Sequence, residues 1–250
     1  MSFTKIGLNL GTKFGVRNGS YLHVGTRVRG LKRDPAESLR NPHGLHYDSL
    51  SKDGHLSTAK KGLNLGKYGI DLPDHIITQC LTHKSFAQGI KPYNQKLSVI
   101  GGHFVKYQAC LHSMELPVSQ KQLLEVGQSE ATMSPEAAGL LVNGLNFGML
   151  GKGSSKMLIS KQSSAEFILR RNLEKLVFWN KRDMQKSHKY NGEYTVLQTV
   201  LNSVVGSIYL LQGQEKATEY VVHELFGNSP DSLTKISEDL LTAKDTAEKI

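Results

Sequence analysis

The sequence predicts an all-α domain preceded by a long basic N-terminal extension. From about residue 70 onward, apolar residues recur at steps of three and four, as on the buried face of a helix, and the alternation typical of strands is hard to find. Positive charge is concentrated upstream, because residues 1–61 carry 11 basic and 4 acidic side chains whereas residues 62–250 carry 20 and 18. This distribution fits a near-neutral folded domain with a cationic arm.

Residues 1–66 form the predicted extension. They are rich in glycine, serine, asparagine and basic residues, they show no sustained periodicity, and no acidic side chain precedes Asp34. A segment of this kind usually neutralises phosphate, so RNA is the expected partner. An acid-poor N-terminus with arginine and serine is also typical of a mitochondrial presequence, and that interpretation stays open. The candidate RNA-binding residues are Lys5, Lys13, Arg17, Arg27, Arg29, Lys32, Arg33 and Arg40.

Residues 67–228 form the predicted helical domain. Asp74 is a candidate N-cap for a first helix, and "NQKL" at 94–97 opens a second helix that ends near Met114. A glycine pair lies within this second helix, although a helical glycine costs about 1 kcal/mol relative to alanine. The apolar spacing predicts that its buried face consists of Leu97, Ile100, Gly101, Phe104, Tyr107, Leu111 and Met114.

Further helical segments follow. Ser134 is a candidate N-cap for "SPEAAGLLVNGL", and residues 163–182 predict an amphipathic helix whose basic face is solvated by default, with an RNA contact as the alternative. Residues 194–227 predict two apolar helices that stop at a glycine. Residues 229–250 form a predicted C-terminal polar helical tail with a thin apolar stripe at Leu233, Ile236 and Leu240.

The bulk composition narrows the class of protein. Apolar runs such as "LVFW" at 176–179 are far shorter than a membrane span, and no secretory signal with an apolar core is recognisable. We therefore expect no membrane span. The two cysteines, Cys80 and Cys110, fall on apolar helical positions, so two buried free thiols in a reducing compartment are expected.

Three ordered segments resemble the RNase III endonuclease-domain family. They are "LTHKSF" at 81–86, "NQKLSVIGGHFV" at 94–105 and "TVLQTVLNSVVGSIYLLQGQEKATEYVVHELF" at 195–226. The resemblance covers roughly residues 70–226 and implies an RNase III-like helical domain. The residues in register with the family motifs include Asn94, Leu97, Gly101, Gly206, Ile208, Tyr209, Leu210 and Gly213.

The resemblance also identifies what is missing. That family cleaves RNA with divalent metal ions held by a Glu and an Asp four apart on one helix and by an Asp and a Glu three apart on a later helix. The matching positions here are Ser98, Gly102, Thr199 and Asn202, and Gln95 replaces an accessory Glu. Neutral oxygens without a carboxylate do not hold Mg²⁺ against water. We therefore expect no catalysis by the family mechanism, no metal and no cofactor.

No other chemistry is favoured by the sequence. His83 in "LTHKSF" is expected to bond to backbone at a helix end, and "GMLGKGSSK" at 148–156 departs from the phosphate-loop spacing, so it is expected to be a loop that can touch phosphate. His103 and His112 flank the acid-free site without a nucleophile or an orienting group. The N-terminal histidines lack a cysteine or carboxylate to complete a metal site and are expected to be solvated: His43, His46 and His55.

The functional expectation follows from the resemblance and the charge distribution. Only 24 residues follow Phe226, too few for the double-stranded-RNA-binding module usual in the family, so RNA affinity is expected from the basic extension. An RNase III-like domain with this combination is similar to an RNase III-like protein family of the fungal mitochondrial large ribosomal subunit. The leading hypothesis is a structural ribosomal constituent in the mitochondrial matrix.

That hypothesis names several partners. It implies mitochondrial rRNA, other large-subunit ribosomal proteins, and a second RNase III-like protein as heterodimer partner. Two alternatives stay open at this point. One is an inactive RNase III-like subunit of an RNA-processing complex, and the other is an active nuclease with rearranged ligands.

Overall fold

The computed structural model of the chain describes residues 39–51, 54–115, 141–150, 153–181, 183, 186 and 191–247. Within these residues the structure is mostly helical, which confirms the predicted fold class. The α-helices are α2 (His55–Gly62), α3 (Asp74–Leu81), α4 (Gln95–Glu115), α6 (Gly153–Leu158), α7 (Lys161–Arg170), α9 (Glu193–Tyr220) and α10 (Leu233–Ala247). Shorter helical segments are η1 (Tyr47–Ser49), η2 (Leu65–Tyr68), η3 (Phe86–Gly89), η4 (Phe147–Met149), η5 (Glu174–Leu176) and the π-helical η6 (Val221–Leu225).

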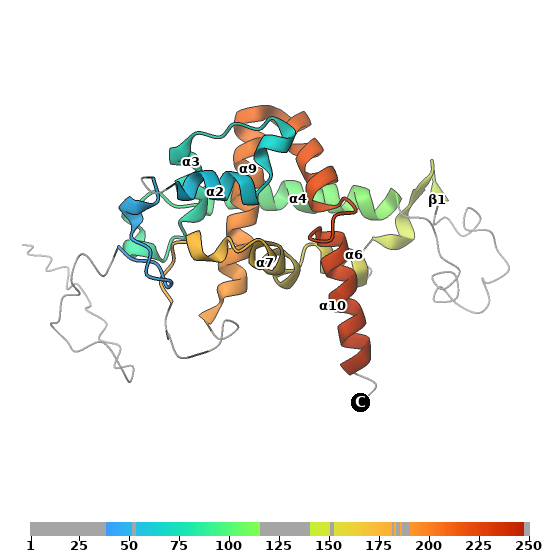
Figure 1. Cartoon of the computed structure of the whole chain (residues 1–250). Coiled ribbons are helices and arrows are strands. Elements are labelled where there is room, and N and C mark those ends of the chain that lie inside the picture. The colour runs from blue at the N-terminus through green and yellow to red at the C-terminus, as the bar shows by residue number, and fades with distance from the viewer. Residues whose placement is uncertain are drawn as a thin grey trace, which may run out of the picture. The chain divides into compact units, whose positions relative to one another are not determined.

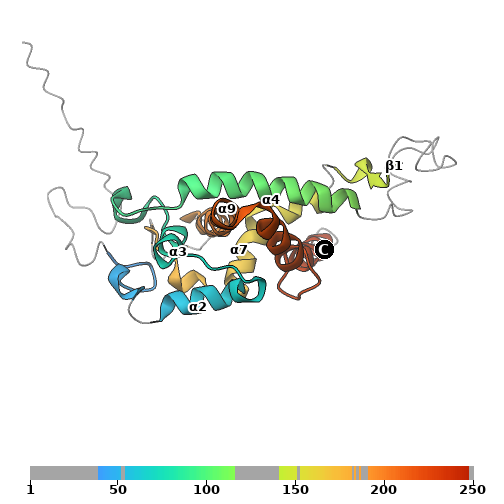
Figure 2. The ribbon, with the colours of Figure 1, turned by 90° about the horizontal axis from the view of Figure 1, so that it is seen from above.

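Helices α4 and α9 form the centre of the fold and cross each other steeply (Figure 1). Helices α3 and α7 pack against α9, and α10 packs against α6 and α7. Viewed from above, α4 runs along one edge of the folded body, with α9, α7 and α2 on one side of it (Figure 2). The largest fully buried side chains of the core include Tyr220, Phe86, Phe167 and Phe178.

The crossing of α4 and α9 depends on two glycines. A Cβ atom at Gly101 would overlap the backbone oxygen of Asn202, and a Cβ atom at Gly206 would overlap the backbone oxygen of Leu97. A side chain at either position would therefore have to displace a helix backbone. Gly102 differs, because a Cβ atom there would meet only the side chain of Asn202, with Nδ2 at 3.1 Å. Packing requires the first glycine of the pair but not the second.

The buried face of α4 differs from the predicted one. Ile100 and Tyr107, both predicted to be buried, are 37% and 54% exposed, and Val99 is 54% exposed. Apolar spacing alone could not identify the inward face, because both sides of α4 carry apolar residues. The glycine contact decides it, since Gly101 must face α9. The residues that α4 buries are Ser98, Gly101, Phe104, Val105, Gln108, Ala109, Ser113 and Met114.

The folded body begins upstream of the boundary predicted at residue 66. The described residues from 39 onward belong to one compact unit, and the segment that precedes residue 67 contributes to its core. The sequence pattern did not reveal this segment because its helices α2 and η2 are only 8 and 4 residues long. The core residues that it supplies are Leu50, Leu56, Ala59, Leu63 and Leu65.

A buried carboxylate fastens this segment to the C-terminal helices. Glu224 in η6 is 2% exposed and accepts hydrogen bonds from Asn64 Nδ2 at 2.7 Å, Tyr68 Oη at 2.9 Å and Arg171 Nη2 at 2.6 Å. Arg171 also donates to the carbonyl oxygen of Gly62 at 3.1 Å. Burial by itself raises the pKa of the Glu224 carboxyl, but the hydrogen bonds from Asn64, Arg171 and Tyr68 outweigh burial and bring the pKa below its ordinary value.

The helix predicted over 163–182 ends sooner than expected. Helix α7 stops at Arg170, and Asn172 has a positive φ of 53°, a conformation that asparagine adopts readily after a helix. The chain then passes through η5 into an extended stretch, where Phe178 pairs with Thr82 in a parallel bridge. The β-branched and aromatic residues of "LVFW" suit this extended backbone, and the helical prediction there is wrong.

The helix predicted from Ser134 also needs correction. Its first half lies outside the described residues, and residues 141–146 form a hairpin of strands β1 (Leu141–Val142) and β2 (Leu145–Asn146). Asn143 and Gly144 connect the strands with positive φ values of 51° and 79°. An Asn-Gly pair between short apolar runs favours a tight hairpin turn, and here it overrides the apolar spacing.

Helix α9 joins the two apolar helices that the sequence predicts. They meet at Gly213, whose φ of 89° and ψ of 172° are not helical, and the second continues into η6. By length and composition, Glu193–Leu225 is long and apolar enough to cross a membrane, a feature that inspection of shorter apolar runs did not reveal. This is weak evidence for a span because core helices pass the same test, and 56% of the apolar window is buried inside the fold.

Two terminal features of the helices differ in detail from the prediction. Asp74 is the first residue of α3, with Pro73 at the cap position, and its carboxylate pairs with Lys60 Nζ at 2.9 Å. The predicted C-terminal tail does form a helix, α10, but it belongs to the core, because Leu233 and Ile236 are fully buried.

Replacing Gly101 by alanine is expected to lower the free energy of unfolding by about 3 kcal/mol or more, because the methyl group would force the backbones of α4 and α9 apart. The matched control is Gly102→Ala, which meets only a flexible amide and removes a helical glycine. That control is expected to be neutral or to stabilise the protein by up to about 1 kcal/mol. Urea unfolding followed by circular dichroism measures both variants, and equal losses would contradict the role given to Gly101.

Glu224→Gln is expected to lower the free energy of unfolding at pH 7 by about 3 kcal/mol, because Arg171 would remain buried without its counter-charge. The folded-state pKa of Glu224 lies below its unfolded value, so the stabilisation is present above the unfolded pKa of about 4.3 and is lost as pH falls through the folded-state pKa. The difference between wild type and variant should therefore shrink below about pH 4.

Urea unfolding at pH 7, 5 and 3 checks this expectation. The matched control is Glu219→Gln, which removes a half-exposed carboxylate paired with Lys216 at 2.9 Å. Its expected cost is below about 0.5 kcal/mol. If the loss of unfolding free energy in Glu224→Gln did not change with pH, the inference that the Glu224 carboxyl is ionised in the folded protein would be wrong.

Candidate functional site

The candidate site lies where α4 crosses α9. Ser98 and Gly102 come from α4, and Thr199 and Asn202 come from α9. The crossing brings Gly102 and Asn202 together, because Nδ2 and Cγ of Asn202 lie 3.1 and 3.6 Å from the point that a Cβ atom at Gly102 would occupy. The side chain of Asn202 thus covers the position where the residue at 102 has no side chain of its own.

The two hydroxyl groups of the site bond within their own helices. Ser98 Oγ donates to the carbonyl oxygen of Gln95 at 2.9 Å, and Thr199 Oγ1 donates to the carbonyl oxygen of Val196 at 2.7 Å. Such bonds to the preceding turn are the usual arrangement for serine and threonine inside a helix. Each hydroxyl proton is therefore committed to local backbone rather than to a shared centre.

A divalent cation such as Mg²⁺ does not fit these residues. Hard cations take oxygen ligands and depend on carboxylates to balance their charge. The four positions supply two hydroxyls, one amide and one glycine, and in the part of the chain that the structure describes no three His, Cys, Asp or Glu side chains come together. No metal-dependent step can be derived from this donor set.

The start of α4 is held by hydrogen bonds to the end of α3. Asn94 Nδ2 donates to the carbonyl oxygen of Cys80 at 3.0 Å. The backbone N–H of Asn94 donates to the carbonyl oxygen of Thr82 at 2.9 Å. His83 Nδ1 accepts from the backbone N–H of Ser85 at 3.2 Å, which confirms the predicted backbone bond of this helix-end histidine. Burial, and to a smaller extent Lys84, lowers the pKa of His83. This histidine therefore has a structural role in the turn that follows α3.

The two cysteines differ in exposure, so the prediction of two buried thiols is half wrong. Cys80 is fully buried, its Sγ lies 3.0 Å from Ser207 Oγ, and burial raises the pKa of its thiol to about 11. Cys110 is free and exposed on α4. The apolar spacing of α4 predicts that Cys110 is buried. The prediction fails because this side of α4 is exposed to solvent.

The remaining histidines form no reactive arrangement in the described part of the chain. His46 Nδ1 accepts from the backbone N–H of Asp48 at 3.3 Å and caps η1, while His43 is exposed in the preceding turn. His112 stacks on Phe226 with ring centroids 5.1 Å apart, and burial lowers the pKa of His112. His103 is exposed on α4.

Most of the predicted RNA-binding cations lie outside the described residues, namely Lys5, Lys13, Arg17, Arg27, Arg29, Lys32 and Arg33. Arg40 is described, is exposed, and pairs with His46 in an isolated antiparallel bridge. Its neighbour Asn41 is buried and fixes the bridge to the body, because its Nδ2 donates to the carbonyl oxygens of Lys175 at 2.7 Å and Val177 at 3.3 Å. The backbone of Arg40 is thus attached to the folded body, while its side chain is exposed.

Two arginines of the basic face predicted for 163–182 form internal ion pairs. Arg171 is buried against Glu224, and Arg170 pairs with Asp239 at 3.0 Å and donates to the carbonyl oxygen of Pro230 at 3.0 Å. Lys175 remains exposed. Arg171 is therefore enclosed in the fold, whereas Arg170 is partly exposed at the surface. The sequence gives no signal of either pairing.

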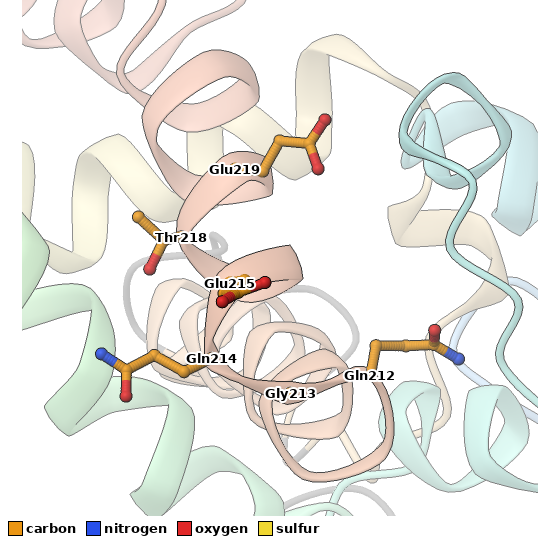
Figure 3. A pocket seen from close by; sticks show the side chains of 6 residues that line it. All are labelled: Gln212, Gly213, Gln214, Glu215, Thr218 and Glu219. Atoms are coloured by element: carbon orange, nitrogen blue, oxygen red, sulfur yellow. The ribbon is translucent and has the colours of Figure 1, made fainter.

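A separate cavity of about 850 Å³ lies at the interruption of α9. Figure 3 shows its side chains around the turn at Gly213, and none of the four site positions belongs to its lining. Within it, Thr218 accepts a hydrogen bond from Gln108 Nε2 at 3.2 Å, and Glu219 pairs with Lys216. Of its lining residues only Gly213 is singled out by the sequence, as a position in register with the family motifs. The lining consists of Gln212, Gly213, Gln214, Glu215, Thr218 and Glu219.

Two comparisons with known proteins bear on this site. A family model described as Ribonuclease-III-like matches residues 73–229, which include all four site positions. Among solved structures, the nuclease domain of ribonuclease III from Campylobacter jejuni, described with structural flexibility in a region involved in dimer formation, is similar at 18% identity. That match covers 68% of this chain and 99% of the other, with a TM-score of 0.40.

The exposure of the thiols leads to a simple prediction. A maleimide reagent at pH 7.5 is expected to modify one thiol of the folded chain, Cys110, and both thiols in 6 M guanidinium, because burial keeps Cys80 protonated and inaccessible. Mass spectrometry of digested samples assigns the modified residue. The matched control is Cys110→Ser, which should remain unlabelled when folded. Rapid labelling of Cys80 in that variant would contradict the described packing.

Proposed function

The chain belongs to the ribonuclease-III-like family, and we propose that it is a structural constituent of the mitochondrial large ribosomal subunit rather than an RNA-cleaving enzyme. In this role its basic N-terminal segment binds rRNA, and its RNase III-like domain binds a partner protein. In this role the domain is structural: it has the helical fold of the family but lacks the family's catalytic carboxylates.

One observation carries the proposal: the four positions that hold metal-binding acids in the resembling family are Ser98, Gly102, Thr199 and Asn202 here. Hydrolysis of a phosphodiester by that family needs carboxylates that hold divalent metal. The hydroxyls of Ser98 and Thr199 are engaged in their own helices, and Asn202 covers Gly102. These contacts support a scaffold role for the crossing of α4 and α9.

The charge distribution supports the RNA-binding part. Residues 1–61 carry 11 basic and 4 acidic side chains, and such a cationic segment binds phosphate without reading sequence. Arg40 extends this positive charge to the surface of the folded body. Ribosomal RNA is a partner that matches a long, acid-poor segment of this composition.

An uncovered face of α4 supports the partner-binding part. Three apolar residues of α4 are exposed to solvent in the described structure. Their exposed fractions are 54% for Val99, 37% for Ile100 and 54% for Tyr107. Exposed apolar side chains that line one helix face are typical of a protein interface. A second RNase III-like protein is the partner that we propose for this surface.

Co-sedimentation tests the proposal. The tagged chain is expected to migrate with the large subunit of mitochondrial ribosomes in sucrose gradients, and to remain bound in about 0.5 M salt because protein contacts supplement the phosphate contacts. A variant with alanine at the eight candidate cations from Lys5 to Arg40 is expected to dissociate from the subunit at lower salt. Urea unfolding of the variant verifies that the folded body is intact.

Two results would contradict the proposal. Release of the chain from ribosomes at low salt, together with recovery in a complex that processes RNA, would favour the alternative of an inactive subunit of a processing enzyme. Cleavage of duplex RNA by the purified chain, abolished by EDTA, would instead establish an active nuclease with rearranged ligands.

A further inference from the structure

The cavity at the interruption of α9, called the α9 cavity from here on, is tied to the folded body on both sides. Gly213 creates the turn, because its φ of 89° and ψ of 172° break the helix, and a Cβ atom there would meet nothing within 4 Å. Gln212 Nε2 donates to the carbonyl oxygen of Asp71 at 3.0 Å on one side. On the other side the buried Gln108 of α4 donates to Thr218 Oγ1 at 3.2 Å. The volume of about 850 Å³ lies in the range of small-molecule sites.

The lining of the α9 cavity has oxygen acceptors and negative charge, and none of its six residues is basic. Glu215 is exposed, and no ion pair among the described residues includes it. Glu219 Oε2 pairs with Lys216 Nζ at 2.9 Å, and the same ammonium group donates to the carbonyl oxygen of Tyr68 at 3.2 Å. Lys216 thus compensates one of the two carboxylates. The cavity keeps a negative charge although the whole chain has a formal charge of +9.

The spacing of the two carboxylates restricts which cation fits. Glu215 and Glu219 lie four residues apart on the second half of α9, so they share a helix face, with Cβ atoms about 5–6 Å apart. Two amine nitrogens joined by three or four methylene groups are also roughly 5–6 Å apart. Val222, which is 37% exposed, lies one turn further along the same face and offers an apolar contact for methylene groups. Figure 3 shows Glu215, Thr218 and Glu219 on this stretch of helix.

We propose that the α9 cavity binds a linear aliphatic polyamine such as spermidine, with its ammonium groups paired to Glu215 and Glu219. Each ammonium group has several N–H donors, and the side-chain oxygens of Gln212, Gln214 and Thr218 are further acceptors for them. Charge-assisted hydrogen bonds to the carboxylates supply most of the affinity. This small-molecule site does not depend on the proposed function.

The same features disfavour other classes of ligand. An anion would be repelled by the carboxylates. A divalent metal ion needs more carboxylate ligands at one point, and in the described part of the chain no third His, Cys, Asp or Glu joins these two. An arginine-rich peptide presents each cation on a separate side chain. A polyamine places two cations on one methylene chain at the spacing of the two carboxylates.

Isothermal titration calorimetry of the full-length chain, purified free of nucleic acid, tests the proposal with spermidine as the probe. Saturable binding of one spermidine per chain is expected at pH 7.5 and physiological salt, where charges more than roughly 8 Å away are screened and the local carboxylates decide. Glu215→Gln with Glu219→Gln is expected to weaken binding at least tenfold. Butylamine, which has a single ammonium group, is expected to bind at least tenfold more weakly than spermidine.

The matched control is Asp48→Asn with Glu238→Gln, which removes two exposed carboxylates from η1 and α10 and is expected to leave the affinity within twofold. Circular dichroism verifies that both double variants are folded. The proposal is overturned by absence of saturable binding at millimolar spermidine, by equal losses in the two double variants, by equal affinity for butylamine, or by complete displacement with equimolar Mg²⁺. Binding of an oligoarginine peptide without binding of spermidine would also overturn it.

Discussion

The close contact between the backbones of α4 and α9 determines which side of α4 is buried and how the candidate site is arranged. Gly101 and Gly206 allow the two helices to touch where any side chain would overlap a carbonyl oxygen. The contact sets the rotation of α4 about its own axis, so Val99 and Tyr107 face outward and Ser98 faces inward. It also places Gly102 beside Asn202. This constraint is steric, and it holds whether the neighbouring positions are charged or neutral.

Because glycine contacts set the crossing of α4 and α9, the fold does not require acidic residues at the four site positions. Carboxylates that converge on one point repel each other unless a cation lies between them. If no metal is bound, neutral residues such as Thr199 and Asn202 at the crossing avoid that repulsion, while the glycines maintain the crossing. The chain does keep a buried carboxylate, Glu224, but there Arg171, Asn64 and Tyr68 satisfy it. This acidic group remains in the interior because its partners belong to the protein itself.

The existence and order of the main helices could be predicted from the sequence, because periodic apolar residues mark α3, α4, α9 and α10 clearly. The four neutral site positions are assigned from residue identity in register with a motif, and the structure places them on the two helices that cross. Predictions failed where local geometry competed with periodicity. Asn172 and the Asn143–Gly144 pair adopt positive φ and end or replace helices that the apolar spacing favours. The segment from residue 39 was missed because its helices are too short to show a period.

Residue identity alone specifies which chemical groups this protein carries: a basic N-terminal segment, a helical domain, and no carboxylate at the four positions in register with the metal-binding acids of the resemblance. What those groups face depends on how the helices pack. That packing assigned Arg170 and Arg171 to internal ion pairs, buried Cys80 while exposing Cys110, and turned an apolar stripe of α4 outward. The physical reason is that residue types are local properties, whereas the direction a helix faces depends on contacts between segments about 100 residues apart, such as Gly101 with Gly206.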